Sequence, residues 1–312
     1  MESPAKTIAA ARAPAKINLI LRVGSPDDSG YHPLVTVFQA VDMWDEVAIS
    51  PAAVDQLVVD GPGDLSGVPT DSTNIVWGAV EALSRIRGHR DPLHITITKT
   101  IPVAGGMAGG SADAAAALVA LNDLWQLEVA PHELADIAAT LGADVPFSLL
   151  GGLAIGEGRG DVLTPLTRDE PLHCVVIPAD LSLSTPRVYK TLDQIRADAH
   201  VVARAMTDQE VSRITGGVTA GLVDVVENDL QQAALASAPT VQANLDALEE
   251  AGALVALVSG SGPTVWGLCR NSAHATEVVE VLRERGVAAR AVESTPLGTH
   301  LTSYRPAPTA AH

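Results

Sequence analysis

Residues 101–118 read IPVAGGMAGGSADAAAAL, a short loop with four glycines followed by an alanine-rich run. Glycine lets a backbone turn tightly and approach a ligand without a Cβ in the way, whereas alanine favours helix strongly. The stretch therefore predicts a glycine loop that opens into a helix. The free N–H groups and the positive dipole end of that helix would converge just before Ser111, an arrangement that suits phosphate oxygens.

A purely structural role is the alternative for this loop. The glycines could form only a strand-to-helix turn, with Ser111 as the N-cap of the helix and Asp113 complementing its dipole. Because short glycine patterns are common, the rest of the sequence has to decide between a turn and a phosphate site.

Length and composition indicate a globular protein. With 312 residues, 47% of them hydrophobic, the chain can form a substantial core in two domains or one large one. No apolar run reaches the roughly 20 residues that span a bilayer. The N-terminal residues lack the basic-then-apolar pattern of a signal peptide. We therefore expect a cytoplasmic protein with no membrane partner.

The cysteines and histidines do not predict a metal site. Cys174 and Cys269 each lie in a run of strand-forming residues, which predicts buried thiols and no disulfide. The nine histidines are scattered, and the sequence has no HExxH or CxxC spacing. A transition metal caged by the protein is therefore not expected.

The charge of the chain limits its partners. A formal net charge of −17 argues against nucleic acid, because nucleic-acid binding needs a basic face. A small anion could still bind beside local cations, since salt screens distant charges beyond ~8 Å. The chain has far fewer lysines than arginines. Where a lysine does occur, we expect that its compact point charge is needed at that position. Lys16 and Lys99 are the candidates, although a solvated lysine at a strand edge is the alternative for Lys16.

The first part of the chain reads mainly as strands. Turn residues separate five β-rich runs, and the last three are expected to form an antiparallel set. The predicted strands are 8–13, 17–23, 35–42, 46–50 and 56–60, with a bend next to Lys16 between the first two.

Helices alternate with strands around the glycine loop. Ser72 or Thr73 is expected to cap the first helix, and Pro131 to occupy the first turn of the third, which Gly142 ends. The predicted elements are a helix over 74–87, a strand over 94–99 that brings Lys99 to the glycine loop, helices over 111–125 and 131–141, and a hairpin over 151–160. Asp144 follows on a short loop constrained by Pro146, which makes it a catalytic candidate or, alternatively, an Asx-turn or helix cap.

A shift to polar residues and proline within 164–171 predicts a domain boundary. We expect domains at 1–166 and 167–304, with a disordered tail at 305–312. The second domain reads as a ferredoxin-like β-α-β-β-α-β layer, with Thr207 and Glu210 as a capping box. Its predicted elements are strands 172–177, 254–259, 264–269 and 287–292, and helices from about 207, from about 239 and over 273–284.

Four motifs resemble those of the GHMP kinases in their order along the chain. They are PAKINL at 14–19, the glycine loop at 102–111, GADVPF at 142–147 and GSGPTV at 260–265. Within this superfamily, the motifs at 16–19, 30–32 and 141–146 resemble those of the kinases that phosphorylate a cytidine-diphosphate-linked alcohol. The resemblance implies an α+β, two-domain kinase, with an N-terminal domain like ribosomal protein S5 domain 2 and a ferredoxin-like C-terminal domain.

The resemblance also implies where ATP and Mg²⁺ would bind. Asn74 and Lys99 would contribute at the nucleotide side, and Ser111, the only hydroxyl in the loop, would lie near Mg²⁺. The implied phosphate-binding residues are Pro102, Gly105, Gly106, Met107, Ala108, Gly109, Gly110 and Ser111. No Walker lysine follows the glycines, which excludes an ordinary P-loop NTPase.

The same resemblance implies a substrate and a mechanism. The nucleophile would be the 2-hydroxyl of 4-diphosphocytidyl-2-C-methyl-D-erythritol (CDP-methylerythritol), an intermediate of non-mevalonate isoprenoid synthesis. An alcohol is a poor nucleophile until a base receives its proton, a role implied for Asp144. Lys16 would lie beside Asp144 and stabilise charge on the phosphate oxygens, while Asn18 would help to position the substrate.

Aromatic residues are implied for the cytidine end of the substrate. The base would lie between Tyr31 and Tyr189, with His32 at the cytosine edge and Thr185 at the base or sugar. Tyr189 could instead be a core residue. These residues favour the cytidine-containing substrate over those of homoserine or mevalonate kinase.

Two further possibilities stay open. The chain could be a nucleotide-binding regulator without turnover, although the presence of both Lys16 and Asp144 argues against that. It could act as a monomer or as a homodimer.

Overall fold

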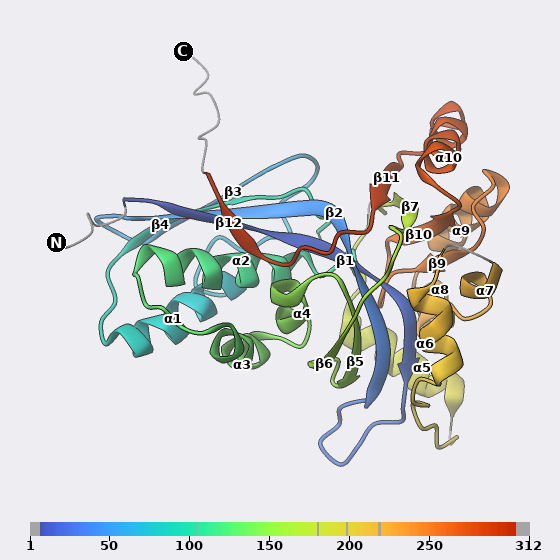
Figure 1. Ribbon diagram of the computed structural model, residues 1–312, viewed down its shortest axis with the longest axis horizontal. Coiled ribbons are helices and arrows are strands. Elements are labelled where there is room, and N and C mark those ends of the chain that lie inside the picture. The colour runs from blue at the N-terminus through green and yellow to red at the C-terminus, as the bar shows by residue number, and fades with distance from the viewer. Residues whose placement is uncertain (1–6, 104, 180, 198, 218–219, 304–312) are drawn as a thin grey trace.

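The computed structural model describes residues 7–303 apart from 104, 180, 198, 218 and 219. The tail predicted at 305–312 lies outside the described residues. Figure 1 shows two groups of helices and strands side by side, joined by the long strands β1 (Ala9–Val23) and β2 (Leu34–Pro51). The α+β, two-domain prediction is confirmed.

The first sheet is built around β1 and β2. Its central order is β12-β1-β2-β4-β3, while β5 and β6 extend from β2, and β8 pairs with β1. Its remaining strands are β3 (Gln56–Asp60), β4 (Leu93–Thr98), β5 (Leu153–Gly158), β6 (Val162–Leu166), β8 (Glu227–Asn228) and β12 (His300–Thr302).

Two details of this sheet differ from the sequence prediction. The runs predicted on either side of Lys16 form one strand, because a register shift between Pro14 and Ala15 absorbs the expected bend. The antiparallel placement of 56–60 was wrong, since β3 pairs with β4 in parallel. A parallel pair needs a long crossover, which the helix between the two strands supplies.

Among the described residues of the first half of the chain, four helices follow: α1 (Ile75–Arg87), α2 (Gly109–Leu124), α3 (Pro131–Leu141) and α4 (Val145–Leu150). Asn74 caps α1 through its side chain, so the predicted cap at Ser72 or Thr73 was wrong by one or two residues. Pro131 at the start of α3 and Gly142 at its end are confirmed. The alanines of α2 are fully buried, and their small size lets this helix pack closely on β1 and β2 (Figure 1).

The second sheet has the order β11-β7-β10-β9, with all neighbours antiparallel. Its strands are β7 (His173–Ile177), β9 (Ala256–Val258), β10 (Val265–Cys269) and β11 (Arg290–Glu293). The helices are α5 (Thr185–Arg196), α6 (Asp208–Thr215), α7 (Ala220–Val223), α8 (Gln231–Ser237), α9 (Thr240–Glu250) and α10 (Ser272–Glu284). The ferredoxin-like arrangement and the Thr207–Glu210 capping box are confirmed, whereas α5, α7 and α8 were not predicted.

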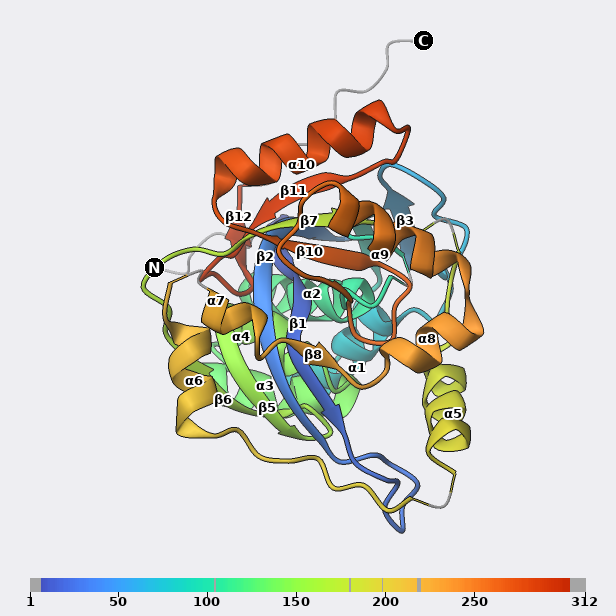
Figure 2. The same cartoon turned by 90° about the vertical axis from the view of Figure 1, so that its right-hand side faces the viewer.

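Strand β7 is buried on both faces. Cys174 and Val176 join the core shared with the first sheet, while Val175 and Ile177 join the core beneath α9 and α10. Successive side chains on a strand point to opposite faces, so β7 connects the two cores. Figure 2 shows α9 and α10 beside this sheet. Both cysteines are buried free thiols, as predicted.

The chain crosses from the first sheet to the second between Leu166, the end of β6, and His173, the start of β7. It later returns, because β12 pairs with β1. Residues 300–302, assigned by sequence to the second domain, therefore form part of the first sheet. Among the described residues, no helix combines the length and apolar character needed to cross a bilayer.

Candidate active site

A cavity of about 670 Å³ lies where β1, the glycine loop and the segment 260–262 meet. Most of the residues singled out from the sequence line it. They are Lys16, Asn18, Asn74, Lys99, Gly105, Gly106, Ala108, Gly109, Gly110, Ser111, Asp144, Thr185 and Tyr189. The structure thus brings together residues that are up to 173 positions apart in the chain, from 16 to 189.

Four candidate residues do not line this cavity. The side chain of Met107 is fully buried in the core, and Pro102 is half-buried at the start of the loop. The His32 ring lies 4.9 Å from the ring of Tyr189, and its Nε2 lies 2.9 Å from Oδ1 of Asp193. Tyr31 is 57% exposed.

The glycine loop leaves the start of α2 open. Ala108 is the N-cap in a left-handed conformation, with φ of 62°, and its side chain cannot cap the helix. Ser111 lies inside the first turn, so the alternative that it is the N-cap was wrong. A Cβ at Gly110 would meet no atom within 4 Å. The loop backbone is therefore open to a ligand at the positive end of a helix.

Gly106 joins the glycine loop to the second domain. Its φ is +77°, and a Cβ there would lie 2.1 Å from the carbonyl oxygen of Ser259. The Gly106 carbonyl accepts hydrogen bonds from Lys16 Nζ at 2.9 Å and from Ser259 Oγ at 3.0 Å. Only glycine fits this close contact.

Lys16 is 5% exposed on β1. Its Nζ donates to Asn18 Oδ1 at 2.7 Å and lies 3.8 Å from Asp144 Oδ2. Burial lowers the pKa of Lys16 below its ordinary value, and the charge of Asp144 only partly offsets this. The strand-edge alternative for Lys16 was therefore wrong.

Asp144 is the N-cap residue of α4, but its side chain makes no capping hydrogen bond. Asp144 contacts the helix through its backbone instead, because its carbonyl accepts a hydrogen bond from Ser148 N at 3.1 Å. The carboxylate side chain is 34% exposed and lies at the cavity beside Lys16. It is thus accessible to a hydroxyl group in the cavity.

Asn18 is held in a defined orientation. Its Nδ2 donates to Thr36 Oγ1 at 2.8 Å, and Thr36 in turn donates to the Ile20 carbonyl at 2.7 Å. This chain of donors fixes Asn18 Oδ1 as the acceptor facing Lys16.

Lys99 is held by two acids that the sequence analysis did not connect with it. Its Nζ donates to Asp45 Oδ2 at 2.5 Å and to Asp113 Oδ2 at 2.7 Å, and all three residues are buried. Burial raises the pKa of Asp113 to about 7, although the Lys99 charge opposes this. Burial also pulls the pKa of Lys99 down, but Asp113 and Asp45 outweigh it and raise the pKa. Lys99 lines the cavity with its charge already paired, so its contact with a nucleotide stays a prediction.

Arg159, on the turn between β5 and β6, was missed by the sequence analysis. It lines the cavity, and its guanidinium lies 5.6 Å from the centre of the Tyr31 ring. Asp161 Oδ2 accepts from Arg159 Nη2 at 2.8 Å, and this bond is the main reason that the pKa of Arg159 is raised. Nothing in the local sequence separates this arginine from the other fifteen.

Family models and curated relatives match this chain. The model for the GHMP kinases N terminal domain matches residues 74–152, and that for the GHMP kinases C terminal domain matches residues 221–288. The 4-diphosphocytidyl-2-C-methyl-D-erythritol kinase of Rhodococcus jostii is 48% identical over 88% of both chains. The chain belongs to the GHMP kinase family. A Nocardioides protein of the same name is 45% identical to this GHMP kinase, over 94% of this chain and 99% of its own.

Solved structures agree with this assignment. A crystal structure of 4-(cytidine 5'-diphospho)-2C-methyl-D-erythritol kinase matches this GHMP kinase with a TM-score of 0.71 and 31% identity, over 91% of this chain and 98% of the other. A homoserine kinase from Cytophaga hutchinsonii matches with a TM-score of 0.69, over 97% and 99% of the two chains. At 20% identity, that match shows a shared fold alone.

Proposed function

We propose that this GHMP kinase transfers a phosphoryl group from ATP to the 2-hydroxyl of CDP-methylerythritol, a reaction of non-mevalonate isoprenoid precursor synthesis. The names of the relatives support this substrate. The observation that carries the chemistry is the Lys16–Asp144 pair, which shares one cavity with the glycine loop.

In this proposal the nucleotide phosphates lie along the glycine loop. The open backbone at Gly110 and the start of α2 support this, since both favour an anion. Asn74 and Lys99 are proposed at the nucleotide side. The Asn74 side chain is held in place by a bond from Val76 N and by its own donation to the Pro69 carbonyl.

Asp144 is proposed to accept the proton of the substrate hydroxyl as the phosphoryl group transfers. Lys16 stabilises the negative charge on the transferring oxygens, and its three contacts hold it in place before the reaction. Asn18 orients Lys16 and, we propose, the substrate.

Mg²⁺ is proposed to bind through the nucleotide phosphates with the Ser111 hydroxyl, where it would neutralise phosphate charge. No group of three or more His, Cys, Asp or Glu residues forms a metal site in the part of the chain that the structure describes. This fits Mg²⁺, which is usually held by few protein ligands together with substrate phosphates.

The cytidine end is proposed to lie between Tyr31 and Tyr189, with His32 and Thr185 making polar contacts. Thr185 Oγ1 lies 2.9 Å from Ser261 Oγ at the cavity wall. Burial, and then the charge of Asp144, raise the pKa of Tyr189, so its ring stays neutral. Arg159 beside Tyr31 is proposed to bind the diphosphate of the substrate.

The remaining expectations stay part of the proposal. They are a boundary between domains 1–166 and 167–304, with residues 300–302 returning to the sheet of the first domain, a cytoplasmic location, a monomer or homodimer, and no nucleic-acid or membrane partner.

ATP consumption tests this function. Wild-type protein should consume ATP with CDP-methylerythritol and not with homoserine or mevalonate, and Asp144→Asn and Lys16→Ala should lose most of the turnover. Turnover with another alcohol and none with CDP-methylerythritol would exclude the proposed substrate. ATP binding without any turnover would favour a regulator.

A further inference from the structure

The segment 259–262 of the second domain forms one wall of the Lys16 environment. A Cβ at Gly260 would lie 3.1 Å from Lys16 Nζ and 3.4 Å from Asn18 Oδ1, so the Gly260 backbone packs directly against both groups. The next residues, Ser261 and Gly262, line the cavity. Any shift of this segment would therefore change the surroundings of the ammonium group.

A buried side chain outside the segment holds its backbone, in addition to the contacts of Ser259 Oγ with the Gly106 carbonyl and of Ser261 Oγ with Thr185 Oγ1. Asn228, at the end of the short strand β8, donates both hydrogens of its Nδ2, to the Val258 carbonyl and to the Gly260 carbonyl, each at 2.8 Å. Its Oδ1 accepts from Leu230 N at 2.9 Å. Because the amide uses two donors and one acceptor, its orientation is fixed, and an acid could not make the same bonds.

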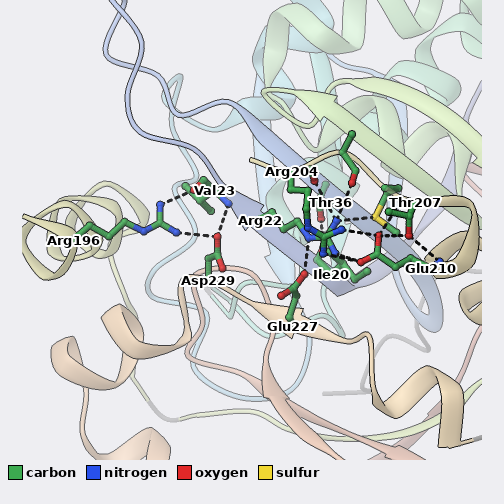
Figure 3. Close-up of polar contacts among 12 residues, drawn as sticks. Ile20, Arg22, Val23, Thr36, Arg196, Arg204, Thr207, Glu210, Glu227 and Asp229 are labelled. Carbon is green, nitrogen blue, oxygen red and sulfur yellow. Dashed lines mark hydrogen bonds and ion pairs between the residues drawn. The ribbon is translucent and has the colours of Figure 1, made fainter. Parts of the chain in front are cut away.

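The residues on either side of Asn228 bind elsewhere, as Figure 3 shows. Glu227 accepts from Arg22 Nε at 2.5 Å. Asp229 Oδ2 accepts from Val23 N and from Arg196 Nη2, both at 2.8 Å. These two acids fasten β8 to the far end of β1 and to α5. Of these three consecutive residues, the two acids bind β1 and α5, and the side chain of Asn228 binds the segment beside Lys16.

We propose that Asn228 is a positioning residue of the active site, which holds the Gly260 backbone against Lys16 and Asn18. This role deepens the proposed kinase function and rests on it for its effect on turnover. The geometric part of the proposal is that the Gly260 backbone shields Lys16 Nζ from reagents in solution. This part does not depend on which alcohol is the substrate.

The substitution Asn228→Asp separates positioning from general stability. The new side chain keeps an acceptor for Leu230 N, but when ionised it turns an oxygen toward two carbonyls that previously received hydrogen bonds. When protonated it can still donate to one of them. The defect should therefore grow as the pH rises and the acid ionises, which a plain loss of packing would not do.

Asp229→Asn is the matched control. It exchanges a carboxylate and an amide in the opposite direction at the next residue, and it keeps an acceptor oxygen for Val23 N and Arg196. Asn228→Ala is the second variant, which removes the two donors without burying a charge, in case Asn228→Asp does not fold.

Two measurements test the proposal. The first is steady-state kinetics with ATP and CDP-methylerythritol, where Asn228→Asp should lower kcat about 100-fold at alkaline pH, as expected for a misplaced catalytic group, and leave both KM values nearly unchanged. The second is the rate at which N-hydroxysuccinimide acetate modifies Lys16, followed by peptide mass spectrometry. This rate should rise in Asn228→Asp and Asn228→Ala and stay at the wild-type value in Asp229→Asn.

The labelling result decides the proposal. Equal Lys16 labelling in wild type, Asn228→Ala and Asp229→Asn would overturn it, and so would a kcat of Asn228→Asp that matches the control at every pH. If wild-type protein shows no turnover with CDP-methylerythritol while the labelling differs as expected, the proposed substrate fails and the positioning role of Asn228 stands.

Discussion

Lys16 Nζ lies 3.8 Å from Asp144 Oδ2, yet the two residues differ sharply in their access to solvent. The lysine is buried on β1, whereas the carboxylate at the start of α4 is 34% exposed in its side chain. The distance is longer than a direct hydrogen bond, so the carboxylate keeps its lone pairs for a proton from another group. The buried ammonium acts on it through charge.

Asp144→Asn should lower kcat about 1,000-fold, because positioned proton acceptors contribute between about 100- and 10,000-fold. ATP affinity should be nearly unchanged, since the glycine loop does not depend on this side chain. Kinetics and nucleotide titration check both parts. The exposed Asp136 on α3 gives the control variant Asp136→Asn. A kcat within tenfold of wild type would contradict the role of proton acceptor, given the lower limit of about 100-fold.

The alkaline limb of the pH–rate profile should report Lys16. Burial lowers its pKa below the ordinary 10.5, so the protonated form that stabilises phosphate charge is lost at lower pH than for an exposed lysine. We expect kcat to fall with a midpoint below 10.5. Lys16→Arg should be slower but should lose this limb, because arginine stays protonated. The same limb in both proteins would show that another group titrates.

Local patterns predicted much of the fold. The run of strand-forming residues in β7, the proline at the start of α3 and the Thr207–Glu210 box depend on neighbours in the chain, so the sequence shows them directly. Helix α5 was missed although Pro186 lies in its first turn, because its mean hydropathy is low and only Val188 and Leu192 are buried.

Long-range pairs of the candidate site could not be predicted in the same way. Lys99 meets Asp45 and Asp113 across 54 and 14 positions, and Gly260 of the second domain packs against Lys16 of β1 although the two are far apart in the chain. One signal was available: Asp45 interrupts an apolar strand, and a buried acid needs a partner. That signal predicts a pair but cannot identify which lysine forms it.

Asp113→Asn should change how stability depends on pH. Burial raises the pKa of Asp113 from 3.8 to about 7, so the folded protein holds a proton that the unfolded chain has lost. The stabilisation of the folded state by this bound proton is fully present below pH 3.8 and is lost as the pH rises through about 7. Wild-type stability should therefore fall relative to Asp113→Asn over that range, as measured by urea unfolding at several pH values. Asp136→Asn, at an exposed position on α3, is the control, and parallel curves for wild type and Asp113→Asn would show that Asp113 has no such shift.

Arg159→Gln tests the diphosphate end of the cavity. The guanidinium is aligned by Asp161 and lies over Tyr31, in position to make charge-assisted bonds to phosphate oxygens. Because Arg159 is about half exposed, we expect a moderate effect: KM for CDP-methylerythritol should rise about tenfold, with kcat and the KM for ATP nearly unchanged. Arg85→Gln, an exposed arginine on α1, removes the same charge far from β5 and β6 and serves as control. If both variants raise KM equally, the net charge of the protein accounts for the effect, and Arg159 has no specific contact. If only Arg159→Gln does so and added salt reduces the difference, the arginine binds the substrate through its charge.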